Sequence, residues 1–552
     1  MPIASTMQDR PLLISGILEH GRRIYPDSRV ITVGADGAVE STYAQVAARA
    51  AQLAHALRGV GVVEGDRVAT FCWNHQAHLE AYLGVSAMGA VMHTLNIRLF
   101  PGQLAFCVNH AEDKVILIDA SLIPLLGKVA SELTTVEHVV VVGGDGECGP
   151  AALAPLEAIP GATIHRYEAF LEGHPSTYDW PELDERAAAS MAYTSGTTGD
   201  PKGVVYSHRS TCLHALGICL GSVAALTERD RVLSVVPMFH ANAWGLAYAA
   251  WWCGADHLLP GPFLQPEPLV RAIERHRPTV AGAVPSIWTG VLHYCSAQGA
   301  DLSSFRLVLC GGSAVPESLM RRFEEELGVH IVQAWGMTET SPVGTVARAP
   351  RGVSEAESWS YRVSQGRVVQ GVEMRVVADD GAALPWDGQS VGELEIRGPW
   401  VTGRYYRVEA PERFDDGWLR TGDVGTIDAR GYVRITDRSK DVIKSGGEWI
   451  SSVDLENALM GHPDVFEAAV IGVHDAKWEE RPLACVVAAE GKEPTPASMR
   501  AFLSDKVARW WLPERWTFVD EIPKTSVGKF DKKLLRERYE AGALDVVEVA
   551  TG

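Results

Sequence analysis

Residues 192–205 read AYTSGTTGDPKGVV, the most informative stretch of the chain. Glycines and small hydroxyl residues fill it between an apolar lead-in and an apolar exit, and such residues let N–H and O–H groups close on phosphate oxygens. It is not a Walker A loop, because Pro201 precedes Lys202 and Gly203 follows it. A flexible surface turn would have a similar composition. The stretch predicts a phosphate-binding loop, to which we assign Thr194, Ser195, Gly196, Thr197, Thr198, Gly199 and Lys202.

On both sides of this loop, short apolar runs alternate with amphipathic stretches. Such alternation is typical of doubly wound βα units with buried parallel strands. The apolar runs lie at 67–71, 115–118, 138–142, 232–236 and 307–309, and the clearest amphipathic stretches at 43–57 and 268–276.

The pattern changes twice toward the C-terminus. From about 366 to 435, short strands are broken by Gly, Pro and Asp, as in a small β-barrel-like lobe. After Arg438, strands near 468–472 and 484–488 alternate with helical patterns, and residues beyond about 541 resemble a loose tail. We predict an α/β protein with a large N-terminal domain of doubly wound subdomains plus the β lobe (1–437), a hinge (438–440) and a smaller, mobile α+β C-terminal domain (441–552).

Composition restricts the function. Lys plus Arg number 50 against 69 Asp plus Glu, and the resulting net charge of -19 argues against general electrostatic binding of nucleic acid or anionic membranes. Nine cysteines without a Cys-x-x-Cys pair suggest neither a zinc knuckle nor a disulfide framework. The first 25 residues lack the apolar core of a signal peptide. These features predict a cytoplasmic protein.

One segment is apolar enough to suggest a membrane span. Residues 232–255 contain no Asp, Glu, Lys or Arg, but Pro237, His240 and Asn242 interrupt them. We predict instead a buried strand, a loop and a core helix from about Ala243, and therefore no transmembrane segment.

Seven separated motifs occur in a fixed order. They are YTSGTTGDPKG (193–203), PMFH (237–240), GGSAVP (311–316), QAWGMTET (333–340), WLRTGD (418–423), DRSKDVIKSGGEWIS (437–451) and PKTSVGK (523–529). With these motifs the chain resembles the AMP-forming acyl-CoA synthetases of the adenylate-forming superfamily over nearly its whole length. PMFHANAW and IKSGGEWIS are most similar to the enzymes that act on medium- or long-chain fatty acids.

The resemblance implies a two-step ligase. A carboxylate attacks the α-phosphate of Mg²⁺-bound ATP to give acyl-AMP and pyrophosphate, and the thiol of CoA then displaces AMP. Aryl-CoA ligases and adenylation enzymes that load a separate carrier protein are the alternatives. A non-catalytic nucleotide-binding homologue is disfavoured because Lys202, Glu339 and Lys529 are all present. A homodimer is expected because the resembling fatty acyl enzymes include dimers.

The nucleotide site is expected around residues 333–339. Trp335 can cover adenine, Thr338 can bond phosphate, and Glu339 can hold Mg²⁺, with the Thr194 hydroxyl a further ligand by analogy. Taken alone, a tryptophan such as Trp335 is more often a core residue, and a glutamate such as Glu339 is more often a surface acid. The family usually has Tyr where Trp335 stands. By resemblance, further nucleotide contacts are Gly312, Ser313, Gln333, Ala334, Asp423 (for the ribose hydroxyls), Arg438, Lys440 and Lys444.

Three lysines after the hinge have different expected roles. Lys529 is predicted to bridge the substrate carboxylate and the α-phosphate during adenylation. Lys440 would be the pivot of the domain rotation. Lys444 begins a loop with Gly446, Gly447 and Trp449 that the resemblance places in the CoA channel.

The acid side is expected near PMFHANAW. The resemblance places His240 between the adenylate and the acceptor path, and makes Trp244 the gate of the acyl tunnel. A buried core residue is the alternative for each of them. Other candidates for the pocket wall are Trp251, Trp252, Trp288 and residues 281–285.

Overall fold

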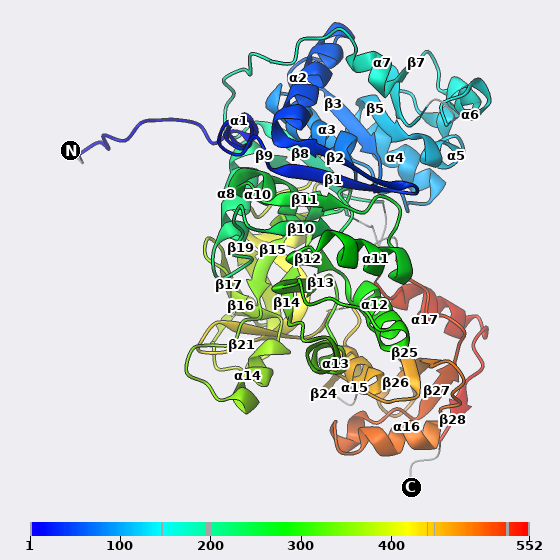
Figure 1. The fold of residues 1–552 in the computed structure, drawn as a ribbon. Coiled ribbons are helices and arrows are strands. Elements are labelled where there is room, and N and C mark those ends of the chain that lie inside the picture. Colours follow the sequence, from blue (N-terminus) through cyan, green and yellow to red (C-terminus); the bar gives the residue numbers. More distant parts are fainter. Residues whose placement is uncertain are drawn as a thin grey trace.

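The structure, a computed structural model, describes residues 3–144, 147–194, 200–438, 440–445, 448–525 and 529–549, with only the backbone of 448 and 449 (Figure 1). Its strands form three sheets. The first two sheets build the N-terminal part of the chain, and the third belongs to the C-terminal part.

The first sheet contains seven strands in the order β7-β6-β5-β3-β4-β8-β9. All neighbours are parallel except β8 and β9, which form an antiparallel pair. Parallel strands need helical crossovers, and these are provided chiefly by α3 and α4. The strands are β3 (Arg67–Phe71), β4 (Val91–Thr94), β5 (Asp113–Asp119), β6 (His138–Val142), β7 (Thr163–Arg166), β8 (Ala188–Tyr193) and β9 (Gly203–Ser207).

The second sheet runs through the centre of the molecule. Its parallel half is β1-β11-β10-β12-β13-β14, with β2 antiparallel at the edge. These strands are β1 (Arg29–Gly34), β2 (Gly37–Thr42), β10 (Arg231–Ser234), β11 (Asp256–Leu259), β12 (Val280–Ala283), β13 (Leu307–Gly311) and β14 (Ile331–Gly336). The predicted doubly wound architecture is confirmed.

The other half of this sheet is antiparallel and holds the strands predicted as a β lobe. They hydrogen-bond onto β14 through β15, so the lobe continues the parallel sheet. They are β15 (Val343–Val346), β16 (Gly366–Val368), β17 (Glu373–Val377), β18 (Ala383–Leu384), β19 (Gly392–Arg397), β20 (Phe414–Asp415), β21 (Trp418–Ile427) and β22 (Tyr432–Arg438).

The C-terminal sheet begins immediately beyond the predicted hinge. Its strands are β23 (Ile443–Ser445), β24 (Glu448–Ile450), β25 (Val465–Asp475), β26 (Glu479–Ala488), β27 (Arg515–Phe518) and β28 (Val547–Glu548). The short strand β28 pairs with β27, so the segment expected to be a loose tail closes this sheet. The C-terminal part of the chain lies beneath α12 and α13 in Figure 1. Ser318 Oγ, on α13, donates a hydrogen bond of 3.4 Å to Met460 O of the C-terminal part.

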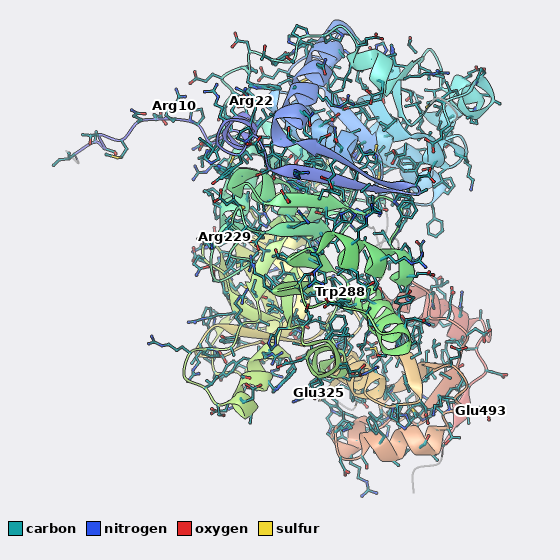
Figure 2. The ribbon with its side chains drawn as sticks, in the orientation of Figure 1. Arg10, Arg22, Arg229, Trp288, Glu325 and Glu493 are labelled. Carbon is teal, nitrogen blue, oxygen red and sulfur yellow. The ribbon has the colours of Figure 1, made fainter. Side chains whose placement is uncertain are left out.

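Helices cover the sheets, and their buried aromatic side chains fix the core. Trp288 is fully buried and packs edge-on against Phe305 and Phe323 (Figure 2), while Trp251 stacks on Tyr43 at 3.9 Å. Of the three tryptophans considered for the pocket wall, Trp251 and Trp288 are therefore core residues, and Trp252 is partly exposed. The helices are α1 (Ile14–Ile24), α2 (Tyr43–Gly59), α3 (Gln76–Ala87), α4 (Pro101–Ala111), α5 (Ile123–Leu126), α6 (Pro150–Leu153), α7 (Tyr167–Leu171), α8 (His208–Cys219), α9 (Ala241–Trp244), α10 (Leu246–Cys253), α11 (Pro266–His276), α12 (Pro285–Gln298), α13 (Glu317–Leu327), α14 (Glu355–Arg362), α15 (Ser452–Met460), α16 (Pro496–Leu503) and α17 (Lys532–Glu540).

The turn before α10 departs from the sequence prediction. Instead of starting a right-handed helix near Ala243, residues 241–245 all have positive φ, between 43° and 75°. Only Gly245 adopts this region without a steric cost, which is about 1–2 kcal/mol for each other residue. The core helix therefore begins at Leu246. This steric cost falls on residues 241–244, which follow His240 and include Trp244.

Residues 3–13 lie outside helices and strands and extend away from the body, with Arg10 on this arm (Figure 2). Within the described ranges, no helix combines the length and the apolar character that crossing a membrane requires.

Candidate active site

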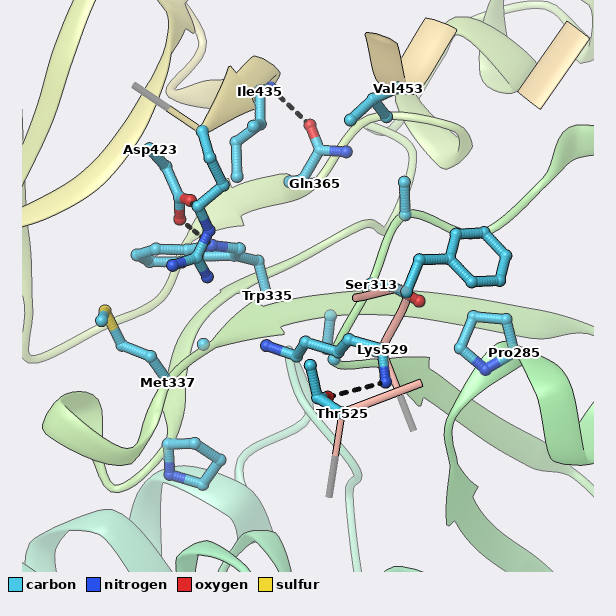
Figure 3. Close-up of a pocket in the computed structure, with 18 of the residues that line it drawn as sticks. Pro285, Ser313, Trp335, Met337, Gln365, Asp423, Ile435, Val453, Thr525 and Lys529 are labelled. Carbon is cyan, nitrogen blue, oxygen red and sulfur yellow. Dashed lines mark hydrogen bonds and ion pairs between the residues drawn. The ribbon is translucent and has the colours of Figure 1, made fainter. Parts of the chain in front are cut away.

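A cavity of about 600 Å³ lies between the second sheet and the C-terminal part. Its walls come from the carboxyl ends of β13 and β14, from β21 and β22, and from the segment around Lys529 (Figure 3). Open α/β sheets bind ligands at the carboxyl ends of their strands. The position therefore agrees with the motifs, which follow these strands.

The ends of the predicted phosphate loop are held together by the β8–β9 pair. Thr194 N donates to Lys202 O at 2.9 Å, and Lys202 N donates to the Thr194 hydroxyl at 3.2 Å. Both residues line the cavity, and the Lys202 ammonium lies 5.0 Å from the centre of the Tyr405 ring. The remaining predicted loop residues, Ser195, Gly196, Thr197, Thr198 and Gly199, lie outside the described residues.

Trp335, Asp423 and Arg438 form a connected group. The Trp335 indole N–H donates to Asp423 at 2.8 Å, and Arg438 Nε pairs with the same carboxylate at 2.7 Å. Asp423 raises the pKa of Arg438, so the guanidinium stays charged. Figure 3 shows Trp335 and Asp423 together on one wall of the cavity. The arrangement offers an aromatic face for a base, beside a buried carboxylate that can accept hydroxyl hydrogens.

Glu339 is a buried carboxylate held by a residue that the motifs did not indicate. The Tyr405 hydroxyl donates to Glu339 Oε1 at 2.7 Å, and burial and this carboxylate raise the Tyr405 pKa. None of the described Lys or Arg side chains forms an ion pair with Glu339 within 4.0 Å. A buried carboxylate without a cation partner fits a hard divalent ion such as Mg²⁺. Tyr405 lies in GRYYR, a segment without a motif that would have revealed it.

The loop after β13 needs its glycines. A Cβ on Gly311 would lie 2.4 Å from Ala334 O, and Gly312 has a φ of +87°. Ser313 and Ala334 also line the cavity.

Gln333 holds this loop through its side chain. Its amide oxygen accepts from Val315 N at 2.7 Å and its amide nitrogen donates to Ser364 O at 2.6 Å. A nucleotide contact by Gln333 would therefore have to use its backbone. Thr338, which lines the cavity, accepts the Tyr206 hydroxyl at its carbonyl, so its own hydroxyl is not used in that bond.

Lys529 lies in the cavity, hydrogen-bonded to Thr525. Thr525 N donates to Lys529 O at 2.7 Å, and Lys529 N donates to the Thr525 hydroxyl at 3.3 Å (Figure 3). Burial, followed by the nearby charge of Arg438, lowers the pKa of Lys529 to about 8. Lys440 also lines the cavity, and burial lowers its pKa. Burial therefore raises the free energy of the protonated Lys529 side chain, and anionic groups bound beside it would stabilise that charge.

Beside Lys529, buried charges join the two parts of the chain. Asp437, on β22, accepts from Ser452 N at 2.9 Å and from the Ser452 hydroxyl. Lys532 donates to Ser452 Oγ and pairs with Glu456 at 2.7 Å. Burial raises the pKa of Glu456 to about 7. We call Asp437, Ser452, Glu456 and Lys532 the interdomain cluster, which sequence reasoning missed because its members carry no shared motif.

His240 and Trp244 also line the cavity. Burial, with a smaller effect of Lys529, lowers the pKa of His240 to about 4, so the imidazole is neutral at pH 7. The Trp244 ring would lie 3.5–3.6 Å from a Cβ at Gly282 or Gly311, so it rests on two strand ends that have no side chain. The cavity wall also contains aliphatic side chains, namely Ile218, Val223, Leu246, Leu309 and Val343.

Lys444, which begins the predicted CoA loop, lies outside the cavity. It is exposed on β23 and is absent from the described cavity wall. The backbone of Lys444 pairs with that of Trp449 in the β23–β24 hairpin, whereas Gly446 and Gly447 lie outside the described ranges. Lys529 and Lys444 are therefore not brought together in this arrangement.

Comparisons with known proteins agree with this geometry. The chain matches the model of the AMP-binding enzyme family over residues 18–406 and that of the AMP-binding enzyme C-terminal domain over residues 454–529.

Two curated relatives match along the chain. A 3-methylmercaptopropionyl-CoA ligase of Ruegeria pomeroyi is 45% identical over 537 residues, covering 97% of this chain and 98% of the relative. A long-chain-fatty-acid–CoA ligase of Thermus thermophilus is 46% identical over 544 residues, covering 97% of each chain.

Among solved structures, the anthranilate CoA ligase AuaEII in complex with anthranoyl-AMP matches with a TM-score of 0.85 and 28% identity, covering 97% of this chain and all of that one. The chain therefore belongs to the AMP-binding enzyme family, within the adenylate-forming acyl-CoA synthetase superfamily, and is an AMP-forming acid–CoA ligase.

Proposed function

We propose that this ligase activates a medium- or long-chain fatty acid to acyl-AMP and transfers the acyl group to CoA. The observation that carries the proposal is the joining of the cationic and aliphatic parts of one cavity. Lys529 and Arg438 line this cavity together with Trp244 and several aliphatic side chains. An acid with its carboxylate near Lys529 could place an alkyl chain against that apolar wall.

The residues have separate tasks in the first step. The Lys529 ammonium stabilises negative charge on the attacking carboxylate and on the α-phosphate. Trp335 and Asp423 orient the nucleoside, and the Lys202 ammonium attracts phosphate oxygens. Glu339, with Thr194, would hold Mg²⁺, which offsets phosphate charge when bound. Pyrophosphate leaves as the acyl–phosphate bond forms.

In the second step the CoA thiolate attacks the acyl carbon and AMP leaves. His240 is neutral near pH 7 and lines the cavity, so it can border the thiol path without adding charge. The β23–β24 hairpin would enter the CoA path only after a domain rotation about Lys440.

A second candidate substrate is a short thioether acid, the class named in one relative. The position of Trp244 favours it, because the indole occupies the space above Gly282 and Gly311 and shortens the apolar part. The two candidates thus differ in whether Trp244 moves aside.

The test is a CoA-dependent AMP-release assay with saturated acids of increasing length, 3-methylmercaptopropionate and benzoate. The fatty acid proposal expects kcat/KM to rise with chain length, because each buried CH₂ contributes about 0.8 kcal/mol. A maximum at 3-methylmercaptopropionate would support the second candidate, and a maximum at benzoate would contradict both.

Trp244→Ala tests the gate directly. The variant should keep its fold and its ATP affinity, while acid binding becomes less dependent on prior nucleotide binding. Acid titrations with and without a nonhydrolysable ATP analogue measure that dependence, and thermal melting measures the fold. Loss of a core tryptophan would instead destabilise the protein by about 3–5 kcal/mol, and this result with unchanged coupling would contradict a gate.

A further inference from the structure

Two of the nine cysteines differ from the others. Cys219 and Cys253 are partly exposed, whereas the other seven cysteines are buried. Cys219 ends α8 and Cys253 ends α10, and the two helices lie side by side (Figure 1). The accessible thiols are thus located at the same end of one helix pair.

The sulfur atoms lie over one turn of α10. Cys219 Sγ is 3.6 Å from Ala249 O, and Cys253 Sγ is 3.6 Å from Ala250 O. Interaction with Cys219 lowers the pKa of Cys253, and interaction with Cys253, together with burial, raises the pKa of Cys219. Cys253 is therefore the better nucleophile of the pair, since the thiolate is the reactive form.

We propose that Cys219 and Cys253 form a reversible intramolecular disulfide. This modification site also restrains the part of the cavity beside Trp244. Among the nine cysteines, this pair combines partial exposure with a second thiol against the same turn of α10.

The chemistry balances with a low-molecular-weight disulfide as the oxidant. The Cys253 thiolate attacks one sulfur of the oxidant and releases one thiolate, which gives a mixed disulfide. Cys219 loses its proton and attacks Cys253 Sγ, which releases the second thiolate. The two cysteines are oxidised by two electrons, and the small disulfide is reduced to two thiols.

The bridge would act on the pocket through the helices that carry it. Ile218, next to Cys219, lines the cavity, and so does Leu246, at the start of α10 directly after the left-handed turn of Trp244. A bridge between Cys219 and Cys253, the last residues of α8 and α10, limits the separation of the two helices. It would thereby limit the space around Trp244. This effect on the acid rests on the proposed function, whereas the bridge itself does not.

The test uses the full-length protein, N-ethylmaleimide and oxidised glutathione. The reduced native protein should be labelled at Cys219 and Cys253. After oxidation both sites should lose labelling, the intact mass should fall by two hydrogen atoms, and a peptide linking the two cysteines should appear. Dithiothreitol should reverse all three changes. Cys212→Ser, a buried cysteine on the same helix, is the matched control and should still form the bridge, whereas Cys219→Ser should not.

A stable glutathione adduct without a linked peptide, or a bridge to any other cysteine, would overturn the proposal. So would labelling that oxidation leaves unchanged. The kinetic measurement is separate. The bridged protein should show a higher KM for the acid and an unchanged KM for ATP. Oxidised Cys219→Ser, which cannot form the bridge, should show no increase in the KM for the acid. An unaltered KM for the acid in fully bridged protein would overturn the restraint.

Discussion

Two segments of the C-terminal part contrast in position. The segment of Thr525 and Lys529 lines the cavity, whereas Lys444, on the β23–β24 hairpin, is exposed outside it. Both segments carry motifs of the family, so each is expected to act near the substrate. One rigid arrangement does not place both there. We propose that this arrangement serves acyl-AMP formation and that thioester formation requires the domain to turn.

The largest effect is expected at Lys529, the residue that defines the inner segment. Lys529→Ala should slow acyl-AMP formation by about 100- to 1000-fold, the usual cost of removing one preorganised group that stabilises transition-state charge. Transfer of supplied acyl-AMP to CoA should keep most of its rate. Pyrophosphate release and acyl-CoA formation from acyl-AMP, measured separately, check the two steps.

Lys524→Ala is the matched control, because Lys524 is exposed, lies in the same motif and pairs with Glu467 at 2.7 Å. It should affect neither step. If Lys529→Ala produced acyl-AMP at the wild-type rate, the inner segment would have no part in adenylation.

The second prediction tests the rotation that the contrast requires. Lys440→Pro fixes φ at the expected pivot, so it should leave acyl-AMP formation active and slow the transfer to CoA. Lys440→Ala, which leaves φ free, should retain much more of the transfer. Equal losses in both half-reactions of the proline variant would argue against a hinge at this residue.

The third prediction concerns the contacts that stabilise the arrangement in which Lys529 lines the cavity. Asp437 belongs to the strand before the hinge, and its partner Ser452 belongs to the domain after it. Asp437→Asn should weaken this contact by about 1.5–3 kcal/mol, the usual value for hydrogen bonds to a charged group. Acyl-AMP formation should slow by about tenfold or more, while transfer from supplied acyl-AMP should not slow.

Ser318→Ala removes another contact across the same interface, a hydrogen bond of 3.4 Å to Met460 O, and should have little effect. A parallel loss of both half-reactions in Asp437→Asn, without a change in melting temperature, would show that the contact does not discriminate between the two arrangements.

The sequence predicts the site where one residue carries its own chemical signal. Lys529, Glu339 and Asp423 lie in motifs, and all three line the cavity. Tyr405 and the interdomain cluster were missed because their roles arise from tertiary contacts between distant residues.

The fold shows the same division. Apolar periodicity predicted the parallel strands, because burial on both faces leaves a direct pattern in the sequence. It did not predict the left-handed turn at residues 241–245, since local propensity favours a right-handed helix there and surrounding packing overrides it. Periodicity also could not distinguish Trp244, beside the cavity, from Trp251 in the core.

The smallest effect is expected on the pH dependence of stability, through Glu456 of the interdomain cluster. Its pKa of about 7 lies above the ordinary value of 4.5 because burial disfavours the charged carboxylate. Between these values the folded protein retains a proton that the unfolded chain has lost, so the contribution of Glu456 to stability decreases as pH rises. Above pH 7 both states are ionised and the penalty is constant, at about 3 kcal/mol at most.

Glu456→Gln removes this titration while keeping an oxygen for Val470 N, which donates to Glu456 at 2.8 Å. The loss of the Lys532 partner should add an offset that is nearly constant between pH 5 and 8, because Lys532 remains protonated there. The melting temperature of the variant should therefore rise relative to wild type as the pH increases through this range. Glu493→Gln, at an exposed glutamate, should follow the wild-type curve. Parallel curves for Glu456→Gln and wild type would mean that Glu456 is already ionised in the folded protein at pH 5, and that Lys532 compensates fully for its burial.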